Sequence, residues 1–249
     1  MKKIAIITGS ASGIGAATAM ELSRRGFSVL INYSKSKEQA EKVAAKCEDA
    51  IVVQADVSDD AQCRKLAQAA MDKWGRIDAL VNNAGTTKFV KHADLDGLSA
   101  DDFLRIYRLN VVAPFQMVRA CAPALKAAKG AVVNVSSVAS LLGTGSSIAY
   151  AASKSALNSL TYSLARVLGP EVRVNAVCPG FVDTPWQSNA LGAAGASKAA
   201  ERYSEMVPLK DYARPEDLAE TIAWLIEGAR QVTGETIFVD GGMHIATPR

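Results

Sequence analysis

The 249-residue sequence predicts a single α/β domain in which helices cover both faces of a doubly wound parallel sheet of about seven strands. Three observations lead to this fold class. Short runs rich in Val and Ile alternate with longer amphipathic stretches, as strands and helices do in repeated βαβ units. The short runs are apolar on both faces, which is typical of strands covered by helices on each side. No linker or low-complexity segment divides the chain, so we expect one domain over residues 1–249.

The predicted elements follow one another in a regular order. The predicted strands cover residues 4–8, 29–32, 51–55, 79–81, 132–136, 172–177 and 237–239. The predicted helices cover residues 14–25, 37–47, 59–74, 101–128, 150–168 and 215–227. The segment 181–213 is irregular, because Pro185, Gly192 and Pro208 interrupt its Ala/Ser-rich sequence. An insertion after the carboxyl end of a strand lies over the ligand crevice of a doubly wound fold, so we interpret 181–213 as a mobile substrate lid.

Composition and charge exclude several kinds of function. The formal net charge of +3 is spread along the chain among interleaved acids, so neither a nucleic-acid surface nor a membrane patch is expected. No apolar run is long enough for a signal sequence or a membrane span. The cysteines are far apart, and His92 and His244 have no clustered ligands around them. We therefore expect a cytoplasmic protein with reduced thiols, no metal, and no nucleic-acid or membrane partner.

A glycine cluster follows the first predicted strand, which leads directly into Thr8-Gly9-Ser10-Ala11-Ser12-Gly13-Ile14-Gly15. Glycines at these positions let the chain turn tightly and bring backbone N–H groups and a helix N-terminus against a pyrophosphate. The spacing Gly-x-x-x-Gly-x-Gly differs from the common Gly-x-Gly-x-x-Gly. Its position between the first strand and the first helix is nevertheless the one that a dinucleotide-binding unit requires.

Tyr150 and Lys154 lie four residues apart in a predicted helix, so they share one face with Cβ atoms roughly 5–6 Å apart. A free tyrosine titrates near pH ~10, and a neighbouring cation stabilises the tyrosinate form. We therefore expect Lys154 to lower the pKa of Tyr150 and to make the phenol a usable acid near neutral pH. The same spacing occurs on many solvated helices, so this interpretation depends on the other motifs.

Together, these motifs resemble those of the short-chain dehydrogenase/reductase family over essentially the whole chain. The resemblance rests on Thr8-Gly9 with Gly13 and Gly15, Asp56-Val57, Asn82-Asn83-Ala84-Gly85, Asn110, Ser137, Tyr150 with Lys154, and Pro179-Gly180. It implies a Rossmann-type fold, and an enzyme that transfers hydride between a nicotinamide cofactor and a carbonyl compound or secondary alcohol.

The resemblance also implies a role for each catalytic residue. Tyr150 exchanges a proton with the substrate oxygen, and Ser137 hydrogen-bonds that oxygen as charge develops. The spacing favours Ser137 over the adjacent Ser136. Lys154 lowers the pKa of Tyr150 and bonds to the cofactor ribose, and Asn110 holds a water that connects Lys154 to solvent. The implied cofactor-binding residues are Gly9, Ser12, Gly13, Ile14, Gly15, Asn32, Tyr33, Ser34, Asp56, Val57, Asn83, Ala84, Gly85, Tyr150, Lys154, Pro179, Gly180, Val182 and Thr184.

The end of the second predicted strand indicates which cofactor is used. An NAD-specific site normally places a carboxylate there, where it binds the ribose hydroxyls and repels a 2′-phosphate. Here Tyr33 stands at the acidic position, between Asn32 and Ser34, and Lys35 adds positive charge. Ser12 departs from the arginine or lysine that many NADP-dependent members carry beside the glycine turn. We expect NADP(H), with NAD(H) as the alternative.

The predicted helix 150–168 is nearly uncharged after Lys154, since only Arg166 follows, which is unusual for a helix with a solvated face. The resemblance implies that this helix and 101–128 pair across a two-fold axis, within a homotetramer. Packing against helices of the same chain is the alternative.

Three functions are compatible with the sequence. The first is an NADPH-dependent reductase of carbonyl compounds, similar to 3-oxoacyl-(acyl-carrier-protein) reductases, with Lys126, Lys129 and Arg173 available to an acidic carrier protein. The second is an NAD(P)-dependent dehydrogenase of a sugar, polyol or other secondary alcohol. The third is a cofactor-binding regulatory protein without turnover. A complete set of catalytic residues disfavours the third, because a protein that only binds has no need of Tyr150.

Overall fold

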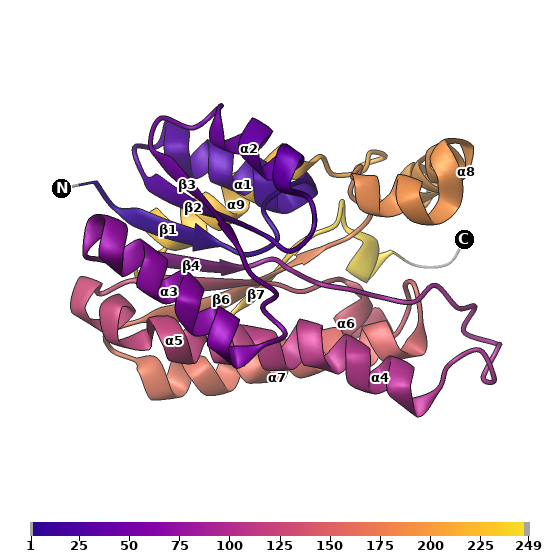
Figure 1. Ribbon diagram of the computed structural model, residues 1–249. Coiled ribbons are helices and arrows are strands. Elements are labelled where there is room, and N and C mark those ends of the chain that lie inside the picture. Colours follow the sequence, from indigo (N-terminus) through magenta and orange to yellow (C-terminus); the bar gives the residue numbers. More distant parts are fainter. Residues whose placement is uncertain (1, 247–249) are drawn as a thin grey trace.

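Seven short runs dominated by Val, Ile and Ala pair as strands of one parallel sheet in the computed structural model, which describes residues 2–246 (Figure 1). The strand order is β3-β2-β1-β4-β5-β6-β7, the doubly wound arrangement that the sequence predicts. The predicted fold class is therefore confirmed, while residues 1 and 247–249 of the predicted domain lie outside the described residues. The strands are β1 (Ile4–Ile7), β2 (Ser28–Tyr33), β3 (Ala50–Gln54), β4 (Ala79–Asn82), β5 (Ala131–Val135), β6 (Arg173–Pro179) and β7 (Thr236–Val239).

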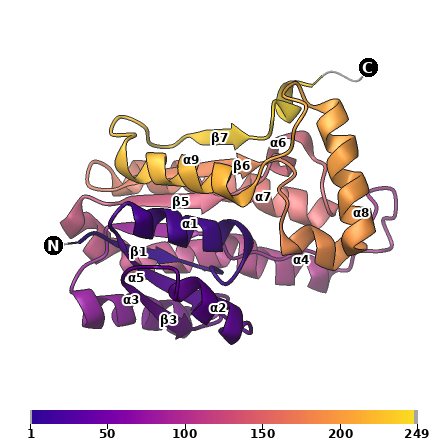
Figure 2. The same cartoon turned by 90° about the horizontal axis from the view of Figure 1, so that it is seen from above.

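Helices cover both faces of this sheet (Figures 1 and 2). On one face lie α1 (Gly13–Arg24), α2 (Lys37–Ala44) and α9 (Pro215–Glu227), and on the other α3 (Asp60–Trp74), α4 (Ala100–Tyr107), α5 (Ala113–Ala128) and α7 (Ile148–Leu168). Among the described residues, no helix combines the length and the apolar character needed to cross a membrane.

The strands build two cores because successive side chains of a strand point to opposite faces. Ile4 and Ile6 pack into the core beneath α3, α5 and α7. Ala5 and Ile7 pack into the core beneath α1 and α9. All four side chains are at most 2% exposed, which removes the first strand from water on both sides. Each fully buried isoleucine stabilises the fold by roughly 1.5–3 kcal/mol.

The predicted helix 101–128 is interrupted in the structure. Between α4 and α5 the chain forms one turn of π-helix, η1 (Arg108–Val112), which contains Asn110. Pro114 lies four residues after Asn110 and has no N–H, so it cannot complete an α-helical hydrogen bond to the Asn110 carbonyl. A widened turn at this point follows from that missing donor, and π-turns are frequent at functional sites.

The expectation of irregular structure at 181–213 is wrong for most of its length, because residues Pro185–Met206 form the helix α8. Pro185 occupies the first turn, where a proline is well tolerated because its missing N–H has no partner there. Gly192, with φ of 70°, kinks the helix into two parts. Both residues are predicted from sequence to interrupt regular structure, whereas Pro185 begins the helix and Gly192 bends it. Two short elements, α6 (Ala139–Leu142) and η2 (Met243–Ile245), were not predicted.

Arg173 on β6 closes the C-terminal end of α9. Its guanidinium donates to the carbonyl oxygens of Leu225 at 2.6 Å, Ile226 at 2.7 Å and Ala229 at 3.0 Å. The carbonyls of Leu225 and Ile226 lie in the last turn of the helix, at the negative end of its dipole, and Ala229 lies just beyond the helix. The Arg173 guanidinium is therefore engaged within the protein, and the suggestion that Arg173 contacts an acidic carrier protein is not supported.

We predict that Arg173→Met lowers the free energy of unfolding by about 2–3 kcal/mol, because three charge-assisted hydrogen bonds are lost and the helix end is left uncapped. Thermal unfolding measures this as a fall of about 4–12 °C in melting temperature. Lys126→Met is the control, since Lys126 is exposed. Equal melting temperatures for the two variants would contradict this role of Arg173.

Candidate active site

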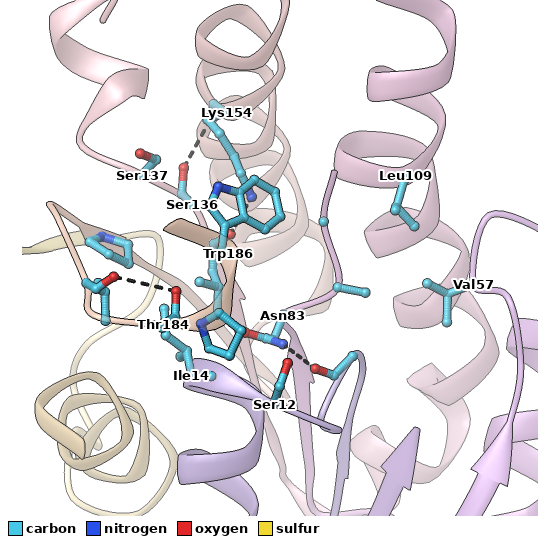
Figure 3. Close-up of a pocket in the computed structure, with 18 of the residues that line it drawn as sticks. Ser12, Ile14, Val57, Asn83, Leu109, Ser136, Ser137, Lys154, Thr184 and Trp186 are labelled. Atoms are coloured by element: carbon cyan, nitrogen blue, oxygen red, sulfur yellow. Dashed lines mark hydrogen bonds between the residues drawn. The ribbon is translucent and has the colours of Figure 1, made fainter. Parts of the chain in front are cut away.

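A cavity of about 350 Å³ lies at the carboxyl edge of the sheet, where the first turns after several strands meet (Figure 3). In this view Ser136, Ser137 and Lys154 lie at its upper end, and Ser12 and Ile14 at its lower end. Most predicted site residues line the cavity: Gly9, Ser12, Gly13, Ile14, Asn32, Ser34, Asp56, Val57, Asn83, Ala84, Gly85, Ser137, Tyr150, Lys154, Pro179, Gly180, Val182 and Thr184.

The glycine turn at the lower end presents an uncapped helix N-terminus to the cavity. Gly9 and Gly13 have φ of 62° and 54°, a left-handed conformation that glycine adopts without steric cost. Ser12, the N-cap of α1, makes no side-chain capping hydrogen bond, and the first turn holds no acidic residue. The free N–H groups and the positive end of the helix dipole therefore remain available to an anionic ligand.

Two asparagines hold this turn in place. The Asn32 side chain accepts a hydrogen bond from the Gly9 N–H at 3.0 Å and donates to the Ala55 carbonyl at 3.0 Å. The Asn83 side-chain nitrogen donates to the carbonyls of Thr8 at 2.9 Å and Gly9 at 3.0 Å. The turn after β1 is thereby tied to the end of β2 and to the loop after β4, and the end of β2 is tied to the residue after β3. Although Asn32 lines the cavity, its amide group is already engaged within the protein.

The reacting end brings together a phenol, a hydroxyl and an ammonium group. Tyr150 and Lys154 lie in the first two turns of α7, and Ser137 follows β5. The Lys154 Nζ donates to the Val135 carbonyl at 2.7 Å and lies 5.7 Å from the centre of the Tyr150 ring. The neighbouring Ser136 is buried, and its hydroxyl donates to the Lys154 carbonyl at 3.2 Å. Ser136 therefore fastens α7 to β5, whereas Ser137 is the partly exposed serine beside Tyr150.

Burial is the largest influence on the pKa values of Tyr150 and Lys154. It raises the pKa of Tyr150 to about 12, although a hydrogen bond with Ser137 acts in the opposite direction. Burial also lowers the pKa of Lys154 to about 8. The expectation that Lys154 brings the pKa of Tyr150 down is therefore not supported, because removal from water disfavours the charged phenolate and is the largest cause of the shift.

The lid helix α8 touches the reacting end at its start and the body of the protein at its end. Near its start, the Trp186 ring lies 6.2 Å from the Tyr150 ring. Near its end, the Tyr203 hydroxyl donates to the Asp240 carbonyl at 2.6 Å. A Cβ on Gly180 would overlap the Tyr203 hydroxyl, so the small residue after Pro179 is required by the helix that packs on it.

Comparison with known proteins places this site in a family. A family model described as enoyl-(acyl carrier protein) reductase matches residues 9–244. A protein assigned as ketoacyl reductase 2 of the granaticin polyketide synthase of Streptomyces violaceoruber is 43% identical, over 97% of this chain and 96% of its own. The 3-oxoacyl-(acyl-carrier-protein) reductase of Synechocystis sp. is 35% identical, over 97% of this chain and 96% of its own. The chain belongs to the short-chain dehydrogenase/reductase family.

Solved structures agree with this membership. A crystal structure from Burkholderia xenovorans, assigned to the short-chain dehydrogenases/reductases, has a TM-score of 0.92 and 41% identity, covering 98% of this chain and 99% of that chain. Ligand-free aldohexose dehydrogenase of Thermoplasma acidophilum has a TM-score of 0.89 and 28% identity, covering 100% of this chain and 96% of that chain. This chain is accordingly an NAD(P)-dependent oxidoreductase of the short-chain type, as its motifs predict.

The cavity of this dehydrogenase/reductase fits a nicotinamide dinucleotide. The uncapped start of α1 suits a pyrophosphate, and Asp56 and Val57 bound the far end, where the adenine half would lie. An added Cβ on Gly85 would stand in ordinary contact with the Asn110 Oδ1, at 3.4 Å, and with the Lys154 Nζ, at 3.8 Å, so both polar groups lie close to this lining residue. Among the described residues, no cluster of His, Cys, Asp or Glu is placed to hold a metal ion.

Three predicted site residues do not line the cavity. The Tyr33 side chain is buried in the core beneath α1 and α9, so the sequence assignment to the cofactor is not supported. Gly15 packs against its neighbours, because a Cβ there would lie 2.5 Å from the Asn83 Nδ2. Asn110 is fully buried beneath the floor. The lining residues that sequence reasoning missed are Ala55, Leu109, Val135, Ser136, Pro185, Trp186 and Gln187.

We predict that Lys154→Met raises the stability of the cofactor-free protein below pH 8, where the wild-type protein must bury an ammonium group. The pKa of Lys154 falls from 10.5 to about 8 on folding, so between these values the unfolded state binds more protons. Wild-type stability therefore rises with pH from about 8 to about 10, by an amount on the order of 2 kcal/mol. Urea unfolding across this range measures the difference between the two proteins. A wild-type slope that persists in Lys154→Met would contradict the assignment.

Proposed function

We propose that this enzyme is an NADPH-dependent reductase in which Tyr150 protonates the oxygen of a substrate carbonyl. The observation that supports this most directly is the meeting of Tyr150 and Ser137 in one cavity, with the Lys154 ammonium behind the phenol. Bound nicotinamide supplies the hydride. Ser137 donates a hydrogen bond to the same oxygen as negative charge develops on it.

Lys154 assists the proton transfer by Tyr150. Once Tyr150 gives up its proton, the ammonium group stabilises the phenolate, and the Val135 carbonyl keeps that ammonium in place. Asn110 would connect Lys154 to solvent through its backbone carbonyl, which Pro114 leaves without an α-helical donor. In alcohol oxidation the same groups act in reverse, with Tyr150 as the base.

The preference for NADPH rests on the residues at the end of β2. Ser34 lines the cavity there, Lys35 follows it, and no carboxylate precedes Glu38 in this stretch. A 2′-phosphate would meet a hydroxyl and a positive charge at this point rather than a repelling carboxylate. The glycine turn would hold the pyrophosphate, while Pro179, Gly180, Val182 and Thr184 would bound the nicotinamide half.

We propose 3-oxoacyl thioesters as the substrate class, because two relatives similar along almost their whole length are named for ketoacyl or 3-oxoacyl reduction. Residues 181–213, with Trp186 beside Tyr150, would close over such a substrate. Oxidation of a sugar, polyol or other secondary alcohol is the second candidate, supported by the similarity to an aldohexose dehydrogenase. NADPH consumption with thioesters, ketones and aldehydes, set against NADP reduction with alcohols, separates the two.

We further propose a cytoplasmic homotetramer in which α5 and α7 contribute to subunit contacts. Large apolar side chains are exposed on these helices: Phe115 is 42%, Tyr162 41% and Val167 68% exposed in the single chain. A partner subunit would remove them from water, which favours association by roughly 25 cal/mol for each Å² buried. Sedimentation velocity distinguishes the tetramer from a monomer.

We predict that Tyr150→Phe lowers kcat at least about 100-fold, because the general acid is lost while the ring that packs on Trp186 is kept. The dissociation constant of NADPH, followed by its fluorescence, should stay within about threefold. Tyr162→Phe, on a tyrosine of the same helix outside the cavity, is the control: it keeps the apolar ring at the proposed subunit contact and should leave kcat unchanged. Undiminished turnover in Tyr150→Phe would refute the mechanism.

We predict that Ser34→Asp raises the KM for NADPH at least about tenfold and leaves the KM for NADH unchanged or lower, because a carboxylate repels the 2′-phosphate. Steady-state kinetics with both cofactors measure the change. Gln68→Glu adds the same charge at an exposed position of α3 and should alter neither constant. Equal KM values for the two cofactors in the wild-type enzyme would exclude the NADPH preference.

A further inference from the structure

We propose that Ser153 is a positioning residue, which holds the turn of α7 carrying Tyr150 and Lys154 in register with the π-turn at Asn110. The inference rests on the proposed function for its kinetic consequences, but its structural part can be tested without turnover. Ser153 lies outside the cavity lining and touches neither substrate nor cofactor space. It therefore acts only through the residues to which it bonds.

The Ser153 hydroxyl bridges two elements in the interior. It is completely buried, donates to the Tyr150 carbonyl at 2.7 Å, and accepts from the Asn110 side-chain nitrogen at 3.0 Å. The remaining Asn110 contacts are to Thr86, whose N–H donates to Oδ1 at 2.8 Å and whose carbonyl accepts from Nδ2 at 2.9 Å. Every polar atom of the Asn110 side chain is thus engaged, and Ser153 is its contact on α7.

This bridge lies beside the buried ammonium group. The Asn110 Oδ1 and the Lys154 Nζ both approach Gly85, at 3.4 Å and 3.8 Å from the position of an added Cβ. Without the Ser153 hydroxyl, Asn110 would keep a buried N–H with no acceptor, a costly arrangement that favours a local shift. Because Asn110 sits in a turn widened opposite Pro114, that shift would alter the spacing between the π-turn and Lys154.

The proton-transfer step depends on this spacing. In the proposed mechanism, Lys154 has to stay close to Tyr150 and within reach of the π-turn that would connect it to solvent. The titratable neighbours that act on the pair are few: Tyr150 and Lys154 face each other on α7, and the buried Cys178 thiol approaches from β6. None of these side chains bonds to the Ser153 hydroxyl. A substitution at Ser153 therefore affects Tyr150 and Lys154 only by changing their positions.

The same helix provides a matched control two turns further on. Thr161 is also completely buried, accepts from the Asn134 side-chain nitrogen at 2.9 Å, and donates to the Leu157 carbonyl at 2.9 Å. The two sites share burial, an asparagine donor and a carbonyl acceptor one turn back on α7. They differ in that only Ser153 bonds to the turn that carries Tyr150 and Lys154.

The test compares Ser153→Ala with Thr161→Val in the full chain. Each variant loses one buried hydroxyl, so each should lower the melting temperature by a similar amount, about 2–4 °C. The decisive measurement is the titration of the Lys154 ammonium by NMR on protein labelled at lysine, with the signal assigned by its loss in Lys154→Met.

In the wild-type protein we expect a titration midpoint near pH 8, because burial depresses the pKa of Lys154. Ser153→Ala should raise this midpoint by at least about half a pH unit, since a loosened turn admits water and relieves that burial. Thr161→Val should leave it unchanged. Ser153→Thr, which keeps the hydroxyl, should restore the wild-type midpoint, and Ser153→Cys replaces the alanine variant if the latter does not fold.

Turnover is the second measurement, with the acetoacetyl thioester of N-acetylcysteamine and NADPH. We expect Ser153→Ala to lower kcat about five- to tenfold without changing the KM for the thioester, and Thr161→Val to change neither. A midpoint that is identical in Ser153→Ala and wild type, or that moves equally in Thr161→Val, overturns the inference. If the wild-type enzyme does not reduce the thioester, the proposed substrate fails, and the Lys154 titration still decides the role of Ser153.

Discussion

A cation held inside the protein determines how the reacting end is built. Lys154 is 4% exposed, and its ammonium is kept in the interior by a hydrogen bond to the Val135 carbonyl. A buried charge is unfavourable unless it is hydrogen-bonded, so the end of β5 and the start of α7 have to meet closely. Ser136 reinforces this contact by donating to the Lys154 carbonyl. The positions of Tyr150 and Ser137 follow, since Tyr150 lies one turn before Lys154 and Ser137 is the second residue after β5.

The opposite end of the cavity depends on backbone groups held by polar side chains. Asn32 and Asn83 bind the glycine turn from the strands on either side, and Thr8 accepts from the N–H groups of Asn83 and Ala84. The side chains of Asn32, Asn83 and Thr8 are thus engaged within the protein. The backbone N–H groups at the start of α1 remain available as hydrogen-bond donors. In the proposed function, a dinucleotide would therefore meet a rigid anion site at its pyrophosphate and a titratable site at its nicotinamide end.

Much of this was predictable because the signals are local. Apolar runs and amphipathic stretches indicated the parallel sheet and its helices, and the strand order agrees with the doubly wound fold. The motif residues from Gly9 to Thr184 line one cavity with few exceptions, since parallel strands bring their carboxyl ends to the same edge. Tyr33 is an exception, because its position at the end of β2 does not reveal that its side chain turns into the core. The helix α8 is another exception. A proline can end a helix or begin one, and a glycine can end a helix or bend it, and the outcome at Pro185 and Gly192 depends on what packs beside them.

The sequence by itself determined the fold class, the glycine turn and the identity of the reacting side chains, because periodicity and motif spacing are properties of neighbouring residues. Only the tertiary structure decided what surrounds those side chains. Burial raises the pKa of Tyr150, against the direction expected from its spacing to Lys154, and lowers the pKa of Lys154, because desolvation comes from packed residues far apart in the chain. Likewise, position 180 requires glycine because Tyr203 packs on it. Arg173 caps the C-terminal end of α9 because the fold brings the carbonyls at that helix end to its guanidinium.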